Sequence, residues 1–193
     1  EHADEIRRRL LMALEEAEQT TDPKQRAFLQ TVVVVGAGPA GCELAGSLIE
    51  LMHRAVHRNF KQLRQSDCRV VLVDLVDRVL PAMAAPLSAA AAGHLEGAGV
   101  ELQLGHKVES IAPGRVCLLG SAGVQQLEAA TICWTAGVRA SRLGGLLSER
   151  TACAVDRGGR LVVSPDFSIP GYPDIRAVGD LCSYSHTTDA KPL

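Results

Sequence analysis

The chain has 193 residues, of which 47% are hydrophobic, and its formal net charge is −2 at pH 7. Such a chain can bury a genuine core, so we expect a soluble globular protein of one domain, or one domain with an appendage. The dispersed positive residues exclude the basic surface that nucleic-acid binding requires. No apolar run is long enough to predict a transmembrane helix or a secretory signal, so we expect a cytoplasmic protein.

The spacing of the six cysteines and of one histidine pair argues against dithiol redox chemistry and against a metal site. No CxxC pair occurs, which argues against dithiol redox chemistry, and we expect the cysteines to act as small buried hydrophobes: Cys42, Cys68, Cys117, Cys133, Cys153 and Cys182. Cys42 opens a predicted helix, but packing is the better explanation of it than a reactive thiol. His53 and His57 have no third ligand nearby, so we predict a solvated helix face and no metal site.

The first third of the chain predicts helices around one buried strand. Apolar residues recur at helical spacing over 3–19, and Pro23 opens a short helix that runs to Leu29, after a polar break that is a candidate domain boundary. Residues 31–35 contain four valines in a row, which suits a parallel strand covered on both faces. A long helix is predicted over 39–63.

Later segments predict a parallel sheet and then an antiparallel meander. Residues 69–74 and 100–104 repeat the strand pattern around an alanine-rich helix at 86–98. Alternating residues over 106–119 and 124–127, separated by glycine turns, predict the meander, and 130–135 predicts a last buried strand. The predicted fold class is therefore α/β, a three-layer Rossmann-like parallel sheet with an antiparallel β-meander. Residues from 141 onward are expected to be loop-rich, with short strands at 160–163 and 175–178.

Between the first predicted strand and the long helix stands the sequence GAGPAG, a G-x-G-x-x-G motif. Gly36 allows a tight turn, Gly38 lets the backbone approach a pyrophosphate, and Gly41 lets the helix pack close to the strand. Pro39 and Ala40 form the first helical turn, where free amides favour an anion. This context favours a dinucleotide site over a glycine-rich turn without a ligand.

An acidic residue ends the second predicted strand. Asp74 would accept hydrogen bonds from the adenosine ribose and repel a 2′-phosphate, so it favours NAD(H) over NADP(H). It follows Gly41 by more than the roughly 20 residues that are usual, which fits a lengthened first helix. Asp77 is the alternative, but it lies beyond the apolar run and could simply be solvated.

Four stretches together resemble a known family. They are VVVVGAGPAGCELAG (32–46), VVLVDLVDRVLP (70–81), WTAGVRA (134–140) and PDIRAVGD (173–180). In order and spacing they resemble type II NADH dehydrogenases, flavoproteins of the superfamily with two dinucleotide-binding domains. The resemblance implies electron transfer from NADH through FAD to a quinone.

The resemblance also assigns roles to individual residues. Glu43 matches an acidic position near the nicotinamide and the flavin, although a helix N-terminal acid explains it equally well. Ala136 and Gly137 match the backbone that passes the nicotinamide half, and Val108 matches a position beside the adenine; a strand-ending turn and a buried valine are the plain alternatives. Asp180 matches the residue that binds the ribityl chain of FAD.

The same resemblance implies that the chain is part of a longer flavoprotein. Residues 1–29 would be the connecting helix from the FAD domain, 30–140 the NAD(H)-binding domain, and 141–193 an incomplete return segment into the FAD domain. Only one G-x-G-x-x-G is present, so we expect the first dinucleotide motif to lie upstream of Glu1 and the chain alone to be inactive. Another FAD-dependent reductase, of ferredoxin, rubredoxin or nitrite reductase type, and a non-catalytic nucleotide-binding module remain the alternatives.

Two expectations concern the surroundings of the chain. The full-length parent would sit peripherally on the cytoplasmic face of the membrane. The helix predicted over 3–19 would have packed on the missing domain, so its apolar face is expected to be uncovered and to favour self-association.

Overall fold

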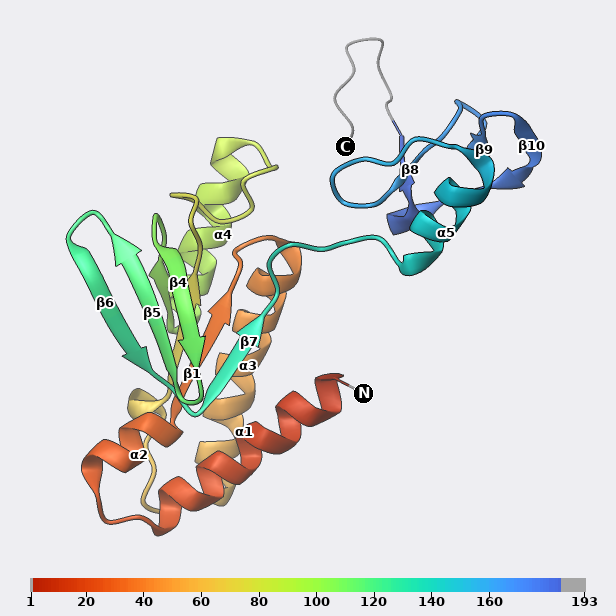
Figure 1. Ribbon diagram of the computed structural model, residues 1–193. Coiled ribbons are helices and arrows are strands. Elements are labelled where there is room, and N and C mark those ends of the chain that lie inside the picture. The colour runs from red at the N-terminus through yellow and green to blue at the C-terminus, as the bar shows by residue number, and fades with distance from the viewer. Residues whose placement is uncertain (1, 185–193) are drawn as a thin grey trace. The chain divides into compact units, whose positions relative to one another are not determined.

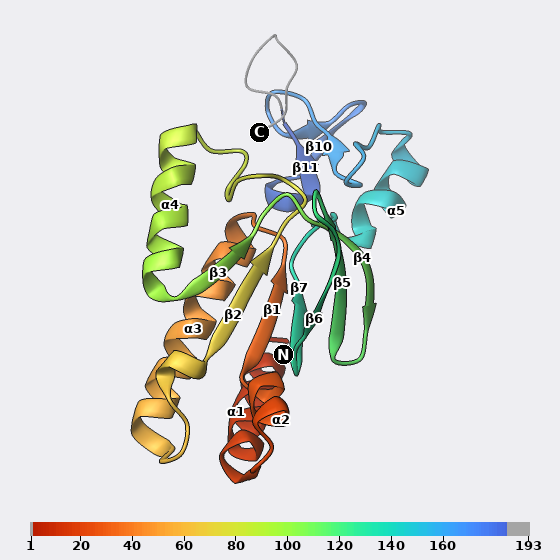
Figure 2. The same ribbon diagram turned by 90° about the vertical axis from the view of Figure 1, so that its left-hand side faces the viewer.

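The computed structural model describes residues 2–184, which form two compact units, 2–136 and 137–184. The first unit is built on a four-stranded parallel sheet with the order β3-β2-β1-β7 (Figures 1 and 2). Its strands are β1 (Thr31–Val35), β2 (Arg69–Val73), β3 (Val100–Gln103) and β7 (Thr131–Trp134). All three strand pairings are parallel. The valine runs form these strands because both faces of the sheet are covered.

Three helices cover one face of the sheet: α1 (His2–Gln19), α3 (Pro39–Asn59) and α4 (Ala85–Ala98). Alternate strand residues such as Val32 and Val34 point toward them, because successive side chains of a strand face opposite sides. The helix residues that complete this core include Leu10, Leu14, Leu48, Ile49, Met52 and Leu95.

The other face of the sheet is covered by the meander of β4 (Lys107–Ala112), β5 (Arg115–Gly120) and β6 (Gly123–Glu128). Figure 2 shows it on the side of the sheet away from α3 and α4. The intervening strand residues pack against its inner side chains in a second core of Val33, Val35, Val71, Val73, Val116, Leu118, Leu127 and Ala129. The predicted three-layer arrangement is therefore confirmed.

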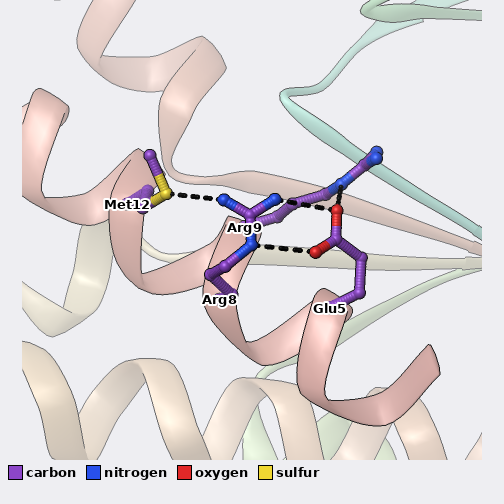
Figure 3. Close-up of polar contacts among 4 residues, drawn as sticks. All are labelled: Glu5, Arg8, Arg9 and Met12. Atoms are coloured by element: carbon purple, nitrogen blue, oxygen red, sulfur yellow. Dashed lines mark hydrogen bonds and ion pairs between the residues drawn. The ribbon is translucent and has the colours of Figure 1, made fainter. Parts of the chain in front are cut away.

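Figure 3 shows a group of polar contacts in the first half of α1, among Glu5, Arg8, Arg9 and Met12. The Glu5 carboxylate accepts hydrogen bonds from Arg8 at 2.8 and 2.9 Å and from Arg9 at 2.6 Å. The pKa of Glu5 is lowered to about 2, chiefly by the hydrogen bond from Arg8 and next by the one from Arg9. Because these side chains are 42–66% exposed, solvent screening leaves these pairs little weight in stability.

The apolar face of α1 is buried within the chain itself, contrary to the expectation of an uncovered face. Leu10, Leu14 and Ala17 are all 0% exposed, packed in the core with α3 and the sheet. The short helix α2 (Pro23–Leu29), capped by the Asp22 carboxylate on the Lys24 N–H, packs against α1. The helix therefore provides no reason for self-association, which stays an untested prediction.

The long helix α3 ends earlier than predicted. It stops at Asn59, and Phe60 is already extended (φ −117°, ψ 142°), so the prediction of helix to residue 63 was wrong. The Glu18 carboxylate of α1 accepts hydrogen bonds from the backbone N–H groups of Lys61 and Gln62 at 2.9 and 3.0 Å. These bonds hold the chain in a non-helical path that leads through a 3₁₀ turn at Gln65–Asp67 into β2.

The second unit is small and contains a helix that the sequence did not predict. Helix α5 (Arg142–Thr151) lies where a loop was expected. Its two glycines lower the intrinsic helix propensity of this segment, so the sequence gives little sign of a helix. Gly144 makes the helix possible here: an added Cβ would overlap the carbonyl oxygen of Gly159. Tertiary packing therefore overrides the local preference.

Short strands complete the second unit. β8 (Leu161–Val162) pairs in parallel with β11 (Cys182–Ser183), and β9 (Ser168–Ile169) pairs antiparallel with β10 (Tyr172–Arg176). The predicted strand at 175–178 was misplaced, because pairing with β9 ends at Arg176. A 3₁₀ turn at Gly179–Leu181 precedes β11, and the core of the unit is Cys153, Leu161, Ile169 and Ala177. Within the described residues, none of the helices combines the length and apolarity that crossing a membrane requires.

Candidate functional site

The glycine loop joins β1 to α3 at the carboxyl edge of the parallel sheet. Gly36 has φ +109°, and an added Cβ would lie 2.8 Å from the backbone nitrogen of Ala136. Its N–H donates to the Val73 carbonyl at 2.8 Å, which ties the loop to β2. Both conformation and space therefore require glycine at this position.

Gly41 is required for a different reason. A Cβ on it would overlap the carbonyl oxygen of Gly36 and would lie 2.8 Å from the Thr135 hydroxyl oxygen. That hydroxyl lies 2.8 Å from the Val35 carbonyl oxygen and 3.1 Å from that of Gly36, so it bridges β1 and the loop. The missing side chain lets α3 begin close against the strand, as predicted from the motif.

Gly38 differs from the other two glycines, because the folded chain does not need it. Its φ of −73° and ψ of −176° are open to any residue, and no atom lies within 4 Å of an added Cβ. It is the N-cap of α3, followed by Pro39 at the first helical position, and both Pro39 and Ala40 are exposed. The first residues of this helix are therefore accessible, and an anion at a helix start is favoured by the helix dipole.

Asp74 stands at the end of β2 and reaches the glycine loop. Its Oδ2 accepts a hydrogen bond from the Ala37 N–H at 2.5 Å, and its Oδ1 accepts one from the Val76 N–H at 2.9 Å. The residue is half-buried, whereas Asp77 is exposed. The geometry therefore favours Asp74 over Asp77 as the acidic residue of the site.

A cavity of about 200 Å³ opens beside this loop, at the same edge of the sheet. It brings together four of the predicted residues, Gly36, Asp74, Val108 and Ala136, from four separate segments of the chain. The remaining lining residues are Val35, Leu75, His106, Lys107 and Trp134. Ligand pockets usually measure about 300–1,000 Å³, so this cavity is large enough for only part of a ligand the size of a dinucleotide.

Trp134, His106 and Leu75 are site residues that sequence reasoning missed. Trp134 was placed inside a buried strand, but it is 60% exposed at the end of β7, and its indole N–H donates to the Ala136 carbonyl at 2.8 Å. His106 Nδ1 lies 2.8 Å from the Leu104 carbonyl oxygen. A usable signal existed: the last residues of parallel strands lie at the edge where ligands bind.

Glu43 lies on α3, one turn beyond the glycine loop. Its side chain is exposed, and within the described residues it has neither a hydrogen-bond nor an ion-pair partner. It does not line the cavity. This position leaves both readings open, a helix-start acid and a residue near a nicotinamide ring.

Gly137 and Asp180 belong to the second compact unit. Gly137 has φ +72° and is exposed, with no atom within 4 Å of an added Cβ, so its backbone conformation is what favours glycine. Asp180 is exposed in the 3₁₀ turn Gly179–Leu181. Neither residue lines the cavity of the first unit.

The cysteines are free thiols, and four of the six are buried. Burial raises the pKa of Cys42, whose thiol donates to the Ala37 carbonyl at 3.4 Å, and raises that of Cys68 to about 11. A raised pKa lowers the thiolate fraction, so packing rather than reactivity explains Cys42. Within the described part of the chain, no group of three or more potential ligands could hold a metal ion.

Comparison with known proteins gives a consistent assignment. Residues 3–191 match the family described as pyridine nucleotide-disulphide oxidoreductase. The chain is 44% identical to the type II NADH:quinone oxidoreductase Ndh of Mycobacterium tuberculosis, over 93% of this chain and 39% of that protein. It is 40% identical to NdhA of the same organism, over 92% of this chain and 38% of that protein.

A solved structure, that of NDH2 from Plasmodium falciparum in complex with NADH, has the same fold. It superposes with a TM-score of 0.78 over 94% of this chain and 38% of its own, at 18% identity. The chain therefore spans about two fifths of the length of these relatives.

Proposed function

The chain belongs to the pyridine nucleotide-disulphide oxidoreductase family, and we propose that it is the NAD(H)-binding part of a flavin-dependent type II NADH dehydrogenase. The observation that carries the proposal is the open space at Gly38. The fold leaves no room for a side chain at Gly36 and Gly41, whereas at Gly38 the space beside the backbone is open, as the close approach of a pyrophosphate to the backbone needs.

Different residues of the first unit would contact different parts of the dinucleotide. The pyrophosphate would lie against Gly38 and the first amides of α3, where the helix dipole favours negative charge. Asp74 would accept hydrogen bonds from the adenosine ribose and would repel a 2′-phosphate, which favours NADH over NADPH. The neighbouring cavity, with Val108 and Trp134 in its wall, would take one end of the ligand.

In the full-length protein, bound FAD would accept the hydride of NADH and pass electrons on to a quinone. This chain would contribute the positioning of the nicotinamide half through Ala136 and Gly137, with Glu43 near the reacting rings and Asp180 on the ribityl chain of the flavin. The M. tuberculosis relatives, named as NADH:quinone oxidoreductases, support this reaction.

The share of the relatives that the chain spans supports an organisation in which the chain is one part of a longer flavoprotein. Residues 1–29 would connect from the FAD domain, 30–140 would form the NAD(H) domain, and 141–193 would return to the FAD domain. Residues 185–193 of the last segment lie outside the described residues. Because the chain corresponds to about two fifths of its relatives, we expect NADH binding without turnover from this chain alone. The full-length protein would attach peripherally to the cytoplasmic face of the membrane, where the quinone is.

Titration of the purified chain with NADH, NADPH and FAD tests the proposal. Binding of each is followed by calorimetry and by the emission of Trp134, the single tryptophan of the chain. We expect NADH to bind more tightly than NADPH, and FAD to bind weakly because most of its site lies outside the chain. Preference for NADPH, or tight FAD binding, would contradict the assignment and favour another flavoprotein reductase. Indifference to the nicotinamide half would favour a non-catalytic nucleotide-binding module.

A further inference from the structure

Ala37, the residue between the first two glycines of the motif, has a buried backbone whose N–H needs a partner. The residue is 0% exposed, and a buried N–H without an acceptor is strongly unfavourable. Within the described residues its acceptor is the Asp74 carboxylate, at 2.5 Å. The side chain at the end of β2 therefore completes the hydrogen bonding of the glycine loop.

The position of Asp74 is fixed independently of that loop. Its backbone N–H donates to the Gln103 carbonyl at 3.2 Å, and its own carbonyl accepts from the His106 N–H at 2.9 Å. Its second carboxylate oxygen accepts from Val76 at 2.9 Å. Because β2 and the chain after β3 hold Asp74 in place, the carboxylate is the anchor and the glycine loop is the segment that it holds.

The other polar atom of Ala37 is tied to the same region. Its carbonyl accepts from the Leu80 N–H at 2.8 Å and from the Cys42 thiol at 3.4 Å. Leu80 adopts φ +47°, an uncommon conformation for a residue with a side chain, to make its bond. The peptide groups on both sides of Ala37 are therefore held by the segment that leaves β2.

We propose that Asp74 is a positioning residue that holds the glycine loop in its ligand-binding shape, in addition to the ribose contact that rests on the proposed function. The carboxylate suits this double role because it has more lone pairs than the two backbone bonds occupy. An asparagine has an acceptor oxygen at only one of the two positions that Oδ1 and Oδ2 occupy, and at the other its amide nitrogen would face an N–H group as a second donor. Selectivity against a 2′-phosphate and the shape of the loop thus depend on one side chain.

This proposal separates two outcomes for a change at Asp74. If the residue only contacted the ribose, Asp74→Asn would weaken NADH binding while NADPH binding held or improved. If it also holds the loop, the same change weakens both nucleotides by about tenfold or more, the equivalent of one lost hydrogen bond to a charged group. Asp77→Asn is the matched control, because it removes the same charge three residues away from an exposed position.

Nuclear magnetic resonance of the nucleotide-free chain tests the hydrogen bond directly. We expect a through-bond correlation between the Ala37 amide nitrogen and the Asp74 carboxyl carbon, and amide exchange at Ala37 about tenfold faster in Asp74→Asn but unchanged in Asp77→Asn. Absence of the correlation in the unaltered chain would overturn the proposal, even if the variant failed to fold.

Nucleotide titration of the same three proteins completes the experiment. Loss of affinity for both NADH and NADPH in Asp74→Asn supports the positioning role, and unchanged or improved NADPH binding would contradict it. If the unaltered chain binds neither nucleotide, the proposed function fails while the amide measurements still decide whether Asp74 holds the loop.

Discussion

Replacement of Gly41 by alanine is the sharpest test of how the glycine loop is packed. The new Cβ would overlap the Gly36 carbonyl oxygen, lie 2.8 Å from the Thr135 hydroxyl oxygen and 2.9 Å from the Gly36 carbonyl carbon. Two of these three neighbours are backbone atoms, which cannot rotate away as a flexible side chain can. Helix α3 and the loop must therefore move apart for the alanine to fit.

The expected cost follows from that overlap. Overpacking of a well-packed interior costs about 1–3 kcal/mol, and contact with the backbone places Gly41→Ala near the upper end of this range. For a chain of this size, about 1 kcal/mol corresponds to about 2–4 °C in Tm. We therefore expect Tm to fall by about 6–12 °C. NADH affinity should fall as well, because the displaced loop includes the proposed pyrophosphate seat.

Gly46→Ala is the matched control on the same helix. An added Cβ there lies 3.7 Å from Leu95 Cδ2, an ordinary contact, and alanine in a helix interior is favoured over glycine by about 0.5–1 kcal/mol. Thermal unfolding followed by circular dichroism should therefore show the two variants shifting in opposite directions. A Gly41→Ala protein as stable as the unaltered chain would refute the packing argument, and so would an equal loss of stability in both variants.

Three further changes test other parts of the structure. Gly38→Ala should lower stability by no more than about 1 kcal/mol, because its Cβ meets no atom and alanine is only a weaker N-cap residue than glycine, yet calorimetry should show NADH affinity reduced about tenfold or more. Glu101→Gln, which breaks the 2.8 and 3.0 Å bonds from Arg69, should cost up to about 1 kcal/mol in urea unfolding, since both side chains are partly exposed. The hydrogen bond from Arg69 lowers the pKa of Glu101, so the pair stabilises the fold above pH 4.5 and this stabilisation is lost as the pH falls below that value. If Glu101→Gln lost stability in acid to the same extent as the unaltered chain, this reasoning would be contradicted. Trp134→Phe should abolish energy transfer from tryptophan to bound NADH, and no such transfer in the unaltered chain would place the ligand elsewhere.

The layers of the first unit could be predicted because its strands have a simple composition. A continuous apolar run such as 31–35 indicates a strand covered on both faces, and the alternating residues over 106–119 and 124–127 indicate an antiparallel meander. The end of α3 could not be predicted, because a carboxylate distant in sequence, Glu18, holds residues 61 and 62 out of the helix. Helix α5 escaped for a similar reason, since the close approach of Gly144 to Gly159 is a tertiary contact.

Some residues that line the cavity were also predicted from the sequence, and others were not. The motif and the strand end predicted Gly36 and Asp74 as site residues, and both line the cavity. Sequence periodicity placed Trp134 in a buried strand, because a strand pattern does not show where neighbouring strands stop. The bond between Asp74 and Ala37 could not be foreseen either, since it joins residues 37 positions apart.

The three glycines of one motif are equivalent in sequence and different in the folded chain. A Cβ added at Gly36 or Gly41 would clash with neighbouring backbone atoms, so packing alone requires glycine at both positions, whether or not a ligand binds. Gly38 meets none, and its backbone is open to any residue. Gly38 serves as the N-cap of a long helix and leaves open space where a ligand can approach the backbone. Gly41→Ala should therefore lower both stability and affinity, whereas Gly38→Ala should lower affinity with little change in stability.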